Sequence, residues 1–153
     1  MFKLTLPLLF AWLSGCSASG LVDGPGQTNA LAGKNWVLRE LDGARVERAN
    51  PEAGTLRLQA NGRIAGTSAC NDVGGDELTW TAGASGRTGS IERNQLGTMV
   101  TTVMGCLDAR AVASGGRFWA QMRNARSWSA NANVLTIRFP DGSAALLTSG
   151  PRR

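Results

Sequence analysis

The 153-residue sequence contains no histidine and no tyrosine, and lysine supplies only two of its 16 cationic side chains. Histidine is the usual general base of enzymes and the commonest metal ligand, so its absence excludes Ser–His and Cys–His pairs and zinc–histidine sites. Charged residues are also sparse, at 18%, whereas hydrophobic residues make up 42%. This balance predicts a folded chain with a hydrophobic core, and the length fits one domain.

The positive charge is spread thinly along the chain. The net charge is +5, and among the arginines only Arg152 and Arg153 are adjacent. A protein that follows a phosphate backbone gathers its cations on one surface. The dispersed pattern indicates solvated surface charges and predicts no nucleic-acid partner.

The N-terminus has the anatomy of a cleaved export signal. Lys3 precedes a mostly apolar stretch, 4–13, which is too short to span a bilayer as a helix because a span needs about 20 residues. The stretch ends in Leu13-Ser14-Gly15-Cys16, which resembles the lipobox of bacterial lipoproteins. We predict a signal peptide at 1–15 and an acylated Cys16; an ordinary signal peptide or a buried N-terminal strand are the alternatives.

The residue after Cys16 and the two other cysteines bear on the compartment. Ser17 stands where an aspartate would be the familiar signal for retention at the inner membrane. Lipid on Cys16 would therefore hold the chain at the outer membrane of a Gram-negative cell, facing the periplasm. Thiols are oxidised there, so we expect Cys70 and Cys106 to form a disulfide. A reactive free Cys70 is disfavoured because no histidine is available to activate it.

Composition divides the chain into four parts. Residues 16–33 are rich in glycine, serine and alanine, which predicts a flexible tether. A folded domain is expected at 34–148, with a short tail at 149–153.

Alternating apolar residues predict a mostly β domain of about six to eight strands. Asn61-Gly62 is the dipeptide favoured by type I′ hairpin turns, and Asp42-Gly43 and Asp141-Gly142 mark further turns. The strands are expected at 35–41, 55–60, 63–66, 77–81, around 91 and 96–100, and at 134–139 and 144–148. The residues expected to share the core are Trp36, Leu56, Leu58, Leu78, Ile137 and Phe139.

One segment has helical periodicity. Asp108 is placed to cap a helix at 109–123, with an apolar stripe formed by Val112, Phe118, Trp119 and Met122. Gly115 and Gly116 each cost about 1 kcal/mol in a helix. Tertiary packing must therefore hold this helix, or it begins after the two glycines.

The only concentration of carboxylates is formed by Asp72, Asp76 and Glu77. Paired carboxylates perform acid–base chemistry in glycoside hydrolysis. Asp and Asn in a glycine-rich turn usually bind their own backbone instead, and we favour that structural reading. The spacing does not match an EF-hand loop, so no metal or cofactor is expected.

Two further stretches resemble the META domain family, which includes HslJ-like heat-shock lipoproteins. They are Gly66-Thr67-Ser68-Ala69-Cys70-Asn71 and Thr102-Val103-Met104-Gly105-Cys106. Members carry similar turns between an early W-x-L strand, here Trp36-Val37-Leu38, and a late L-x-L strand, here Leu135-Thr136-Ile137. Ala69 replaces the usual glycine, and Gly105 replaces the usual alanine. The aromatic residue often found just after the Cys-Asn pair is replaced by Val73 or is missing. The family motif residues without an assigned role are Gly66, Ser68, Asn71, Thr102 and Met104.

The resemblance implies an α+β, mostly β domain: a curled, barrel-like antiparallel sheet with one α-helix. It also implies a loose association with stress and the cell envelope, and no particular chemistry. We therefore expect a non-catalytic, lipid-anchored envelope protein that binds a protein, glycan or small ligand, or supports the envelope under stress. The alternative is an envelope hydrolase or transferase that uses Asp72, Asp76 or Glu77.

Overall fold

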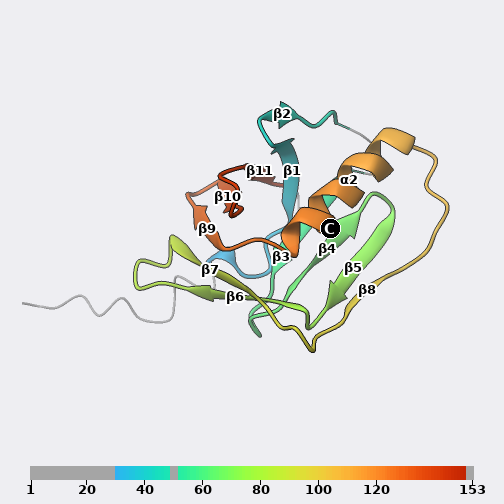
Figure 1. Cartoon of the computed structure of the whole chain (residues 1–153). Helices are drawn as coiled ribbons and strands as arrows, with labels where there is room; N and C mark the ends of the chain where they lie inside the picture. The colour runs from blue at the N-terminus through green and yellow to red at the C-terminus, as the bar shows by residue number, and fades with distance from the viewer. Residues whose placement is uncertain (1–29, 49–51, 151–153) are drawn as a thin grey trace, which may run out of the picture.

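The computed structural model describes residues 30–48 and 52–150, which form one antiparallel sheet of 11 strands and a helix (Figure 1). The helix, α2 (Ala109–Met122), lies between β8 and β9 in the sequence. The strands are β1 (Trp36–Leu41), β2 (Ala44–Arg45), β3 (Gly54–Leu58), β4 (Ile64–Ser68), β5 (Asn71–Gly75), β6 (Leu78–Ala82), β7 (Thr88–Arg93), β8 (Met99–Thr101), β9 (Ser127–Ala130), β10 (Val134–Arg138) and β11 (Ala144–Ser149). No helix among the described residues is long and apolar enough to cross a membrane.

The sheet curls until it almost closes on itself. Its strand order is β6-β7-β9-β10-β11-β1-β3-β4-β5-β8, with β2 paired to β1. An isolated antiparallel bridge joins Arg63, just before β4, to Thr79 in β6, and the amide of Trp80 donates to the carbonyl of Gly62 at 2.8 Å. These contacts close a barrel-like ring from β6 to β4, while β5 and β8 extend from the other half of β4. The expected mostly β fold with one helix is confirmed.

The interior of the curled sheet holds the main hydrophobic core. All six residues expected in the core from their alternation are buried and belong to one cluster. Trp80 and Trp128 pack edge to face there, with their ring centroids 5.8 Å apart. The domain begins before residue 34, because Leu31 is buried in this core and the amide of Gly33 donates to the carbonyl of Leu58.

Helix α2 packs against β3 and β4, as the orange helix in Figure 1 shows. Asp108 caps it by accepting bonds from the amides of Arg110 and Ala111, as predicted. The helix runs through both glycines and ends at Met122. Phe118 and Trp119 are buried with Met122, but Val112 is 43% exposed, so the expected apolar stripe is not buried along its whole length. Val112 follows the buried Ala111 directly and lies at the rim of the face formed by Ala111, Gly115, Phe118, Trp119 and Met122, so its side chain reaches solvent although its turn is packed.

Two hairpin turns illustrate how backbone angles follow the sequence. Asp42 and Gly43 both have positive φ, 54° and 75°, and form the two-residue turn between β1 and β2, the pattern of type I′. The type I′ turn expected at Asn61-Gly62 is wrong, since only Gly62 has positive φ there. The amide of Gly62 donates to the carbonyl of Gln59, which is a type I turn followed by a left-handed glycine.

The β10–β11 turn uses the same arrangement, with Gly142 at a φ of 85°. The hydroxyl and the amide of Ser143 both donate to the Asp141 carboxylate. These hydrogen bonds lower the pKa of Asp141, because they favour its charged form.

Candidate functional site

The family motif residues meet where β4, β5 and the segment after β8 come together. Cys70 lies in the turn between β4 and β5, and Cys106 lies between β8 and α2. A disulfide joins them, with their Cα atoms 5.7 Å apart, a separation ordinary for such a bond. The pairing expected from the sequence is therefore present.

The side chain of Asn71 binds the backbone on the far side of the disulfide. Its Oδ1 accepts a hydrogen bond from the amide of Met104 at 2.6 Å, and its Nδ2 donates to the carbonyl of Met104 at 3.4 Å. Nδ2 also lies 3.4 Å from the sulfur of Cys106. The amide group thus satisfies both backbone groups of Met104, as a neighbouring strand would.

Thr102 completes this attachment. Its hydroxyl accepts a bond from the amide of Asp72 at 2.9 Å and donates to Oδ1 of Asn71 at 3.3 Å. We call the disulfide with the side chains of Asn71 and Thr102 the clamp, and residues 98–107, which it attaches to β5, the strap. Met104 takes part through its backbone, which explains why the sequence could not assign its side chain a role.

The two remaining motif residues allow close packing rather than chemistry. A Cβ at Gly66 would overlap the carbonyl oxygen of Thr55 and lie 2.8 Å from the ring of Trp119. Ser68 lies against α2, where a Cβ at Gly115 would be 2.9 Å from its hydroxyl oxygen. These contacts fix the β4–β5 turn, and with it the position of the clamp.

The two departures from the family pattern differ in their surroundings. Ala69 has a φ of 51°, a left-handed conformation that suits the usual glycine better. Its methyl group is buried with Ala53 and Ala111, which offsets part of that cost. Gly105 has open space where a Cβ would be, so alanine would fit there.

The strap presents apolar side chains to solvent. Val103 is 98% exposed, and the other exposed apolar side chains of the strap are Val100, Met104 and Leu107. Sequence reasoning missed this surface, although a signal was present: no charged residue occurs between Arg93 and Asp108 in a chain that is 18% charged. Exposed apolar side chains gathered on one segment are typical of an interaction surface.

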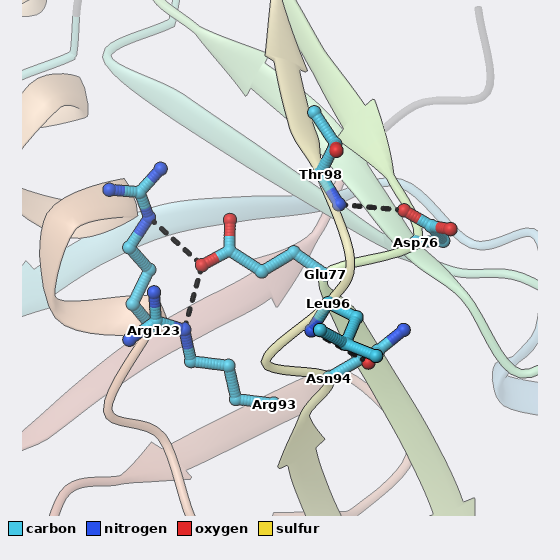
Figure 2. A network of polar contacts seen from close by, with 7 residues as sticks. All are labelled: Asp76, Glu77, Arg93, Asn94, Leu96, Thr98 and Arg123. Carbon is cyan, nitrogen blue, oxygen red and sulfur yellow. Dashed lines mark hydrogen bonds and ion pairs between the residues drawn. The ribbon is translucent and has the colours of Figure 1, made fainter.

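The carboxylates expected as a possible catalytic group have structural partners. Glu77 is buried, and its Oε1 lies 2.8 Å from Nε of Arg93 and 3.3 Å from Nε of Arg123 (Figure 2). Two cations facing one carboxylate compensate the cost of burying it. The space beside Glu77, lined also by Trp119 and Met99, is too small to admit a water molecule.

Asp76 and Asp72 do not join Glu77 in a common site. Asp76 is exposed and accepts a bond from the amide of Thr98 at 2.8 Å, and Figure 2 shows it pointing away from Glu77. Asp72 is exposed on β5. Within residues 30–48 and 52–150, no three Cys, Asp or Glu side chains are grouped to hold a metal ion.

Comparison with known protein families agrees with the resemblance of the two cysteine turns. The family model of the META domain matches residues 29–150. The chain belongs to the META domain family. The membership expected from the two cysteine turns is thus confirmed, and the clamp occupies those turns. Among curated proteins, none matches the sequence.

Two NMR structures similar to this META domain share its fold. An NMR structure of a protein from Burkholderia xenovorans has a TM-score of 0.53 at 17% identity, covering 98% of this chain and 100% of that chain. A second NMR structure has a TM-score of 0.53 at 16% identity, covering 78% and 92%. A DUF4847 family protein from Bacteroides vulgatus ATCC 8482 has a TM-score of 0.47 at 14% identity, covering 80% and 96%.

Proposed function

We propose that this META domain is a non-catalytic binding module of the bacterial envelope, and that the strap is its contact surface. The observation that carries the proposal is the combination of an exposed apolar segment with a clamp made from the family motif. Leaving the apolar side chains of Val103 and Met104 exposed to water is unfavourable, because their burial would stabilise the fold. A disulfide and a set of hydrogen bonds nevertheless keep their segment in place, as a surface prepared for a partner requires.

Location at a membrane is the second part of the proposal. It rests on Leu13-Ser14-Gly15-Cys16, which lies outside the described residues, and on Ser17. Acylation of Cys16 with two or more chains would give stable anchoring, because each buried methylene contributes about 0.8 kcal/mol. The Cys70–Cys106 disulfide suits an oxidising periplasm, so we place the domain there, on the outer membrane, with a role in binding or in support under envelope stress.

The contact surface is tested by photo-crosslinking in living cells. A photoreactive amino acid is introduced at Val103 in the strap and, as the control, at Ala84, which is exposed in the turn between β6 and β7. We expect an adduct of defined mass from position 103 and none from position 84. The adduct should weaken in Asn71→Ala, which removes the hydrogen bonds that hold Met104 in place beside position 103. Equal labelling at both positions would contradict a contact surface on the strap.

A further inference from the structure

β8 forms the open edge of the described sheet. It is last in the strand order and pairs with β5 alone. Just outside the strand, the amide of Thr102 donates to the carbonyl of Asp72, and the amide of Asp76 donates to the carbonyl of Thr98. In an antiparallel pair, positions that bond across the ladder alternate with positions whose backbone groups point the other way. The residues whose N–H and C=O groups point away from β5 are therefore Met99, Thr101 and Val103.

The clamp prolongs this edge beyond the three residues of β8. Because Asn71 binds both backbone groups of Met104 on the inner side, the alternation continues from Thr98 to Met104. No described residue pairs with the outer side of that length, which is therefore a row of free donors and acceptors within the described part of the chain. The segment carries valine and threonine, which favour strands, together with two methionines. Proteins usually protect such edges with charges, proline or a covering segment. The strap contains no charge and no proline.

We propose that this edge pairs with the same edge of a second copy of the chain, antiparallel and about a two-fold axis at Thr101. In that register Thr101 faces the partner's Thr101, and Met99 faces the partner's Val103. All three outward residues of each copy are then hydrogen-bonded, which gives about six backbone bonds in three pairs. Shifting the axis to Val100 places Val103 opposite Gly97, whose amide is already bonded within its own turn to Asn94.

The second copy is favoured over other occupants by self-complementarity, and charge at the contact does not oppose it. A two-fold interface needs one surface that complements itself, and an antiparallel edge centred on one residue meets that condition. Two chains of net charge +5 repel each other, but 14 consecutive residues, 94–107, bring no charge to the contact. This inference rests on the proposed function, because it names the partner of the strap.

A cysteine placed on the axis tests the pairing in cells that make the full chain. Thr101→Cys should give a disulfide-linked dimer on a non-reducing gel, since directly opposed residues are within the Cα separation of a disulfide. Ala84→Cys is the control and should give at least tenfold less dimer. Alkylation with mass spectrometry checks that Cys70 and Cys106 remain paired in both variants.

Solution mass separates strand pairing from lipid-driven clustering. The chain carrying Cys16→Ser should be a dimer by light scattering at about 100 µM. Thr101→Lys should make it a monomer by placing two cations face to face at the axis. Thr88→Lys, on β7 between two other strands, is the matched charge control and should remain dimeric. Unchanged circular dichroism spectra show that both variants are folded.

Each alternative result has a definite meaning. A monomeric Cys16→Ser chain, or a dimer that persists in Thr101→Lys, overturns the self-pairing. If position 103 crosslinks in cells to a different protein while the purified chain is monomeric, the self-pairing is wrong and the strap is still a contact surface. If position 103 gives no adduct and the chain is monomeric, the proposed contact surface fails as well.

Discussion

Adjacent glycines in α2 differ completely in what surrounds them. Gly115 faces the β3 and β4 side, where a Cβ would overlap the carbonyl oxygen of Ala53 and approach Ser68 and Ala69. Gly116 faces open space. The composition alone suggested that both glycines weaken the helix, but only Gly115 is required by packing, because it lets α2 approach the turn that carries Cys70.

This contrast gives a matched pair of substitutions. Gly116→Ala should raise the free energy of unfolding by about 1 kcal/mol, the difference in helix propensity between the two residues. Gly115→Ala should lower it by about 1–3 kcal/mol through overpacking. Urea unfolding of the two variants measures both changes, and equal effects would show that α2 does not pack through Gly115.

At the same scale, Asn71 is the residue on which the strap depends. Asn71→Ala removes both bonds to Met104 and should cost about 0.5–1.5 kcal/mol, because these exposed backbone groups exchange a well-placed partner for water. Asn71→Asp keeps the acceptor but places an oxygen against the carbonyl of Met104. It should therefore destabilise the protein as well, rather than act as a conservative change, and a wild-type urea midpoint in Asn71→Asp would contradict the assigned hydrogen bonds.

At the scale of elements, apolar alternation located the strands that form the core. The hairpins β3–β4 and β10–β11 and the central strand β1 follow the expected pattern, and β6 does so within one residue at each end. β2, β5 and β9 raise the strand number above the expected six to eight, and they were missed for a physical reason. β2 has two residues, β5 reads NDVGG with one apolar side chain, and β9 reads SWSA, which alternates over only four residues and has one large apolar side chain. None is long enough or apolar enough to give a clear alternation of apolar and polar residues.

The candidate site was predicted in part for a related reason. Cysteine count and compartment were enough to expect the disulfide, but the contacts of Asn71 and Thr102 join residues about 30 apart in sequence. No local pattern encodes such a contact. The two arginines that neutralise Glu77 also come from distant elements, β7 and the end of α2, so the sequence alone left its catalytic and structural readings open.

The disulfide joins elements that are 36 residues apart, and its removal should be costly. On the chain-entropy model a loop of this length contributes about 4 kcal/mol at most, against a typical domain stability of about 5–15 kcal/mol. Reduction should therefore lower the melting temperature markedly. Cys70→Ser and Cys106→Ser together should cost less than the sum of the single changes, because both remove the same bond. Strict additivity in thermal or urea unfolding would contradict a shared bond.

At the scale of the whole molecule, the proposed function makes the barrel-like ring a support and the β5–β8 extension the part offered to partners. The ring encloses the main core, whereas the strap lies at the free edge of the sheet. The carboxylate once considered for catalysis belongs to the support, since Glu77 ties β7 to the end of α2 through Arg93 and Arg123. This separation is consistent with a binding protein whose contacts are made by one segment.

The proposed anchoring concerns the whole chain and is tested by one substitution. Cys16→Ser should abolish lipid attachment, so the chain should stay uncleaved by the lipoprotein signal peptidase or leave the membrane fraction. Fractionation with mass spectrometry of the intact chain makes both outcomes visible. If the variant keeps the wild-type mature mass and membrane recovery, the chain is not anchored through Cys16.

The central claim is that the motif residues hold the strap extended with its outer edge free, and residue-resolved amide hydrogen exchange tests it most directly. In dilute protein, the amides of Thr102 and Met104 should exchange at least tenfold more slowly than those of Thr101 and Val103, and Asn71→Ala should abolish the protection of Met104. Uniform exchange along the strap, or unchanged protection of Met104 in Asn71→Ala, would contradict the account.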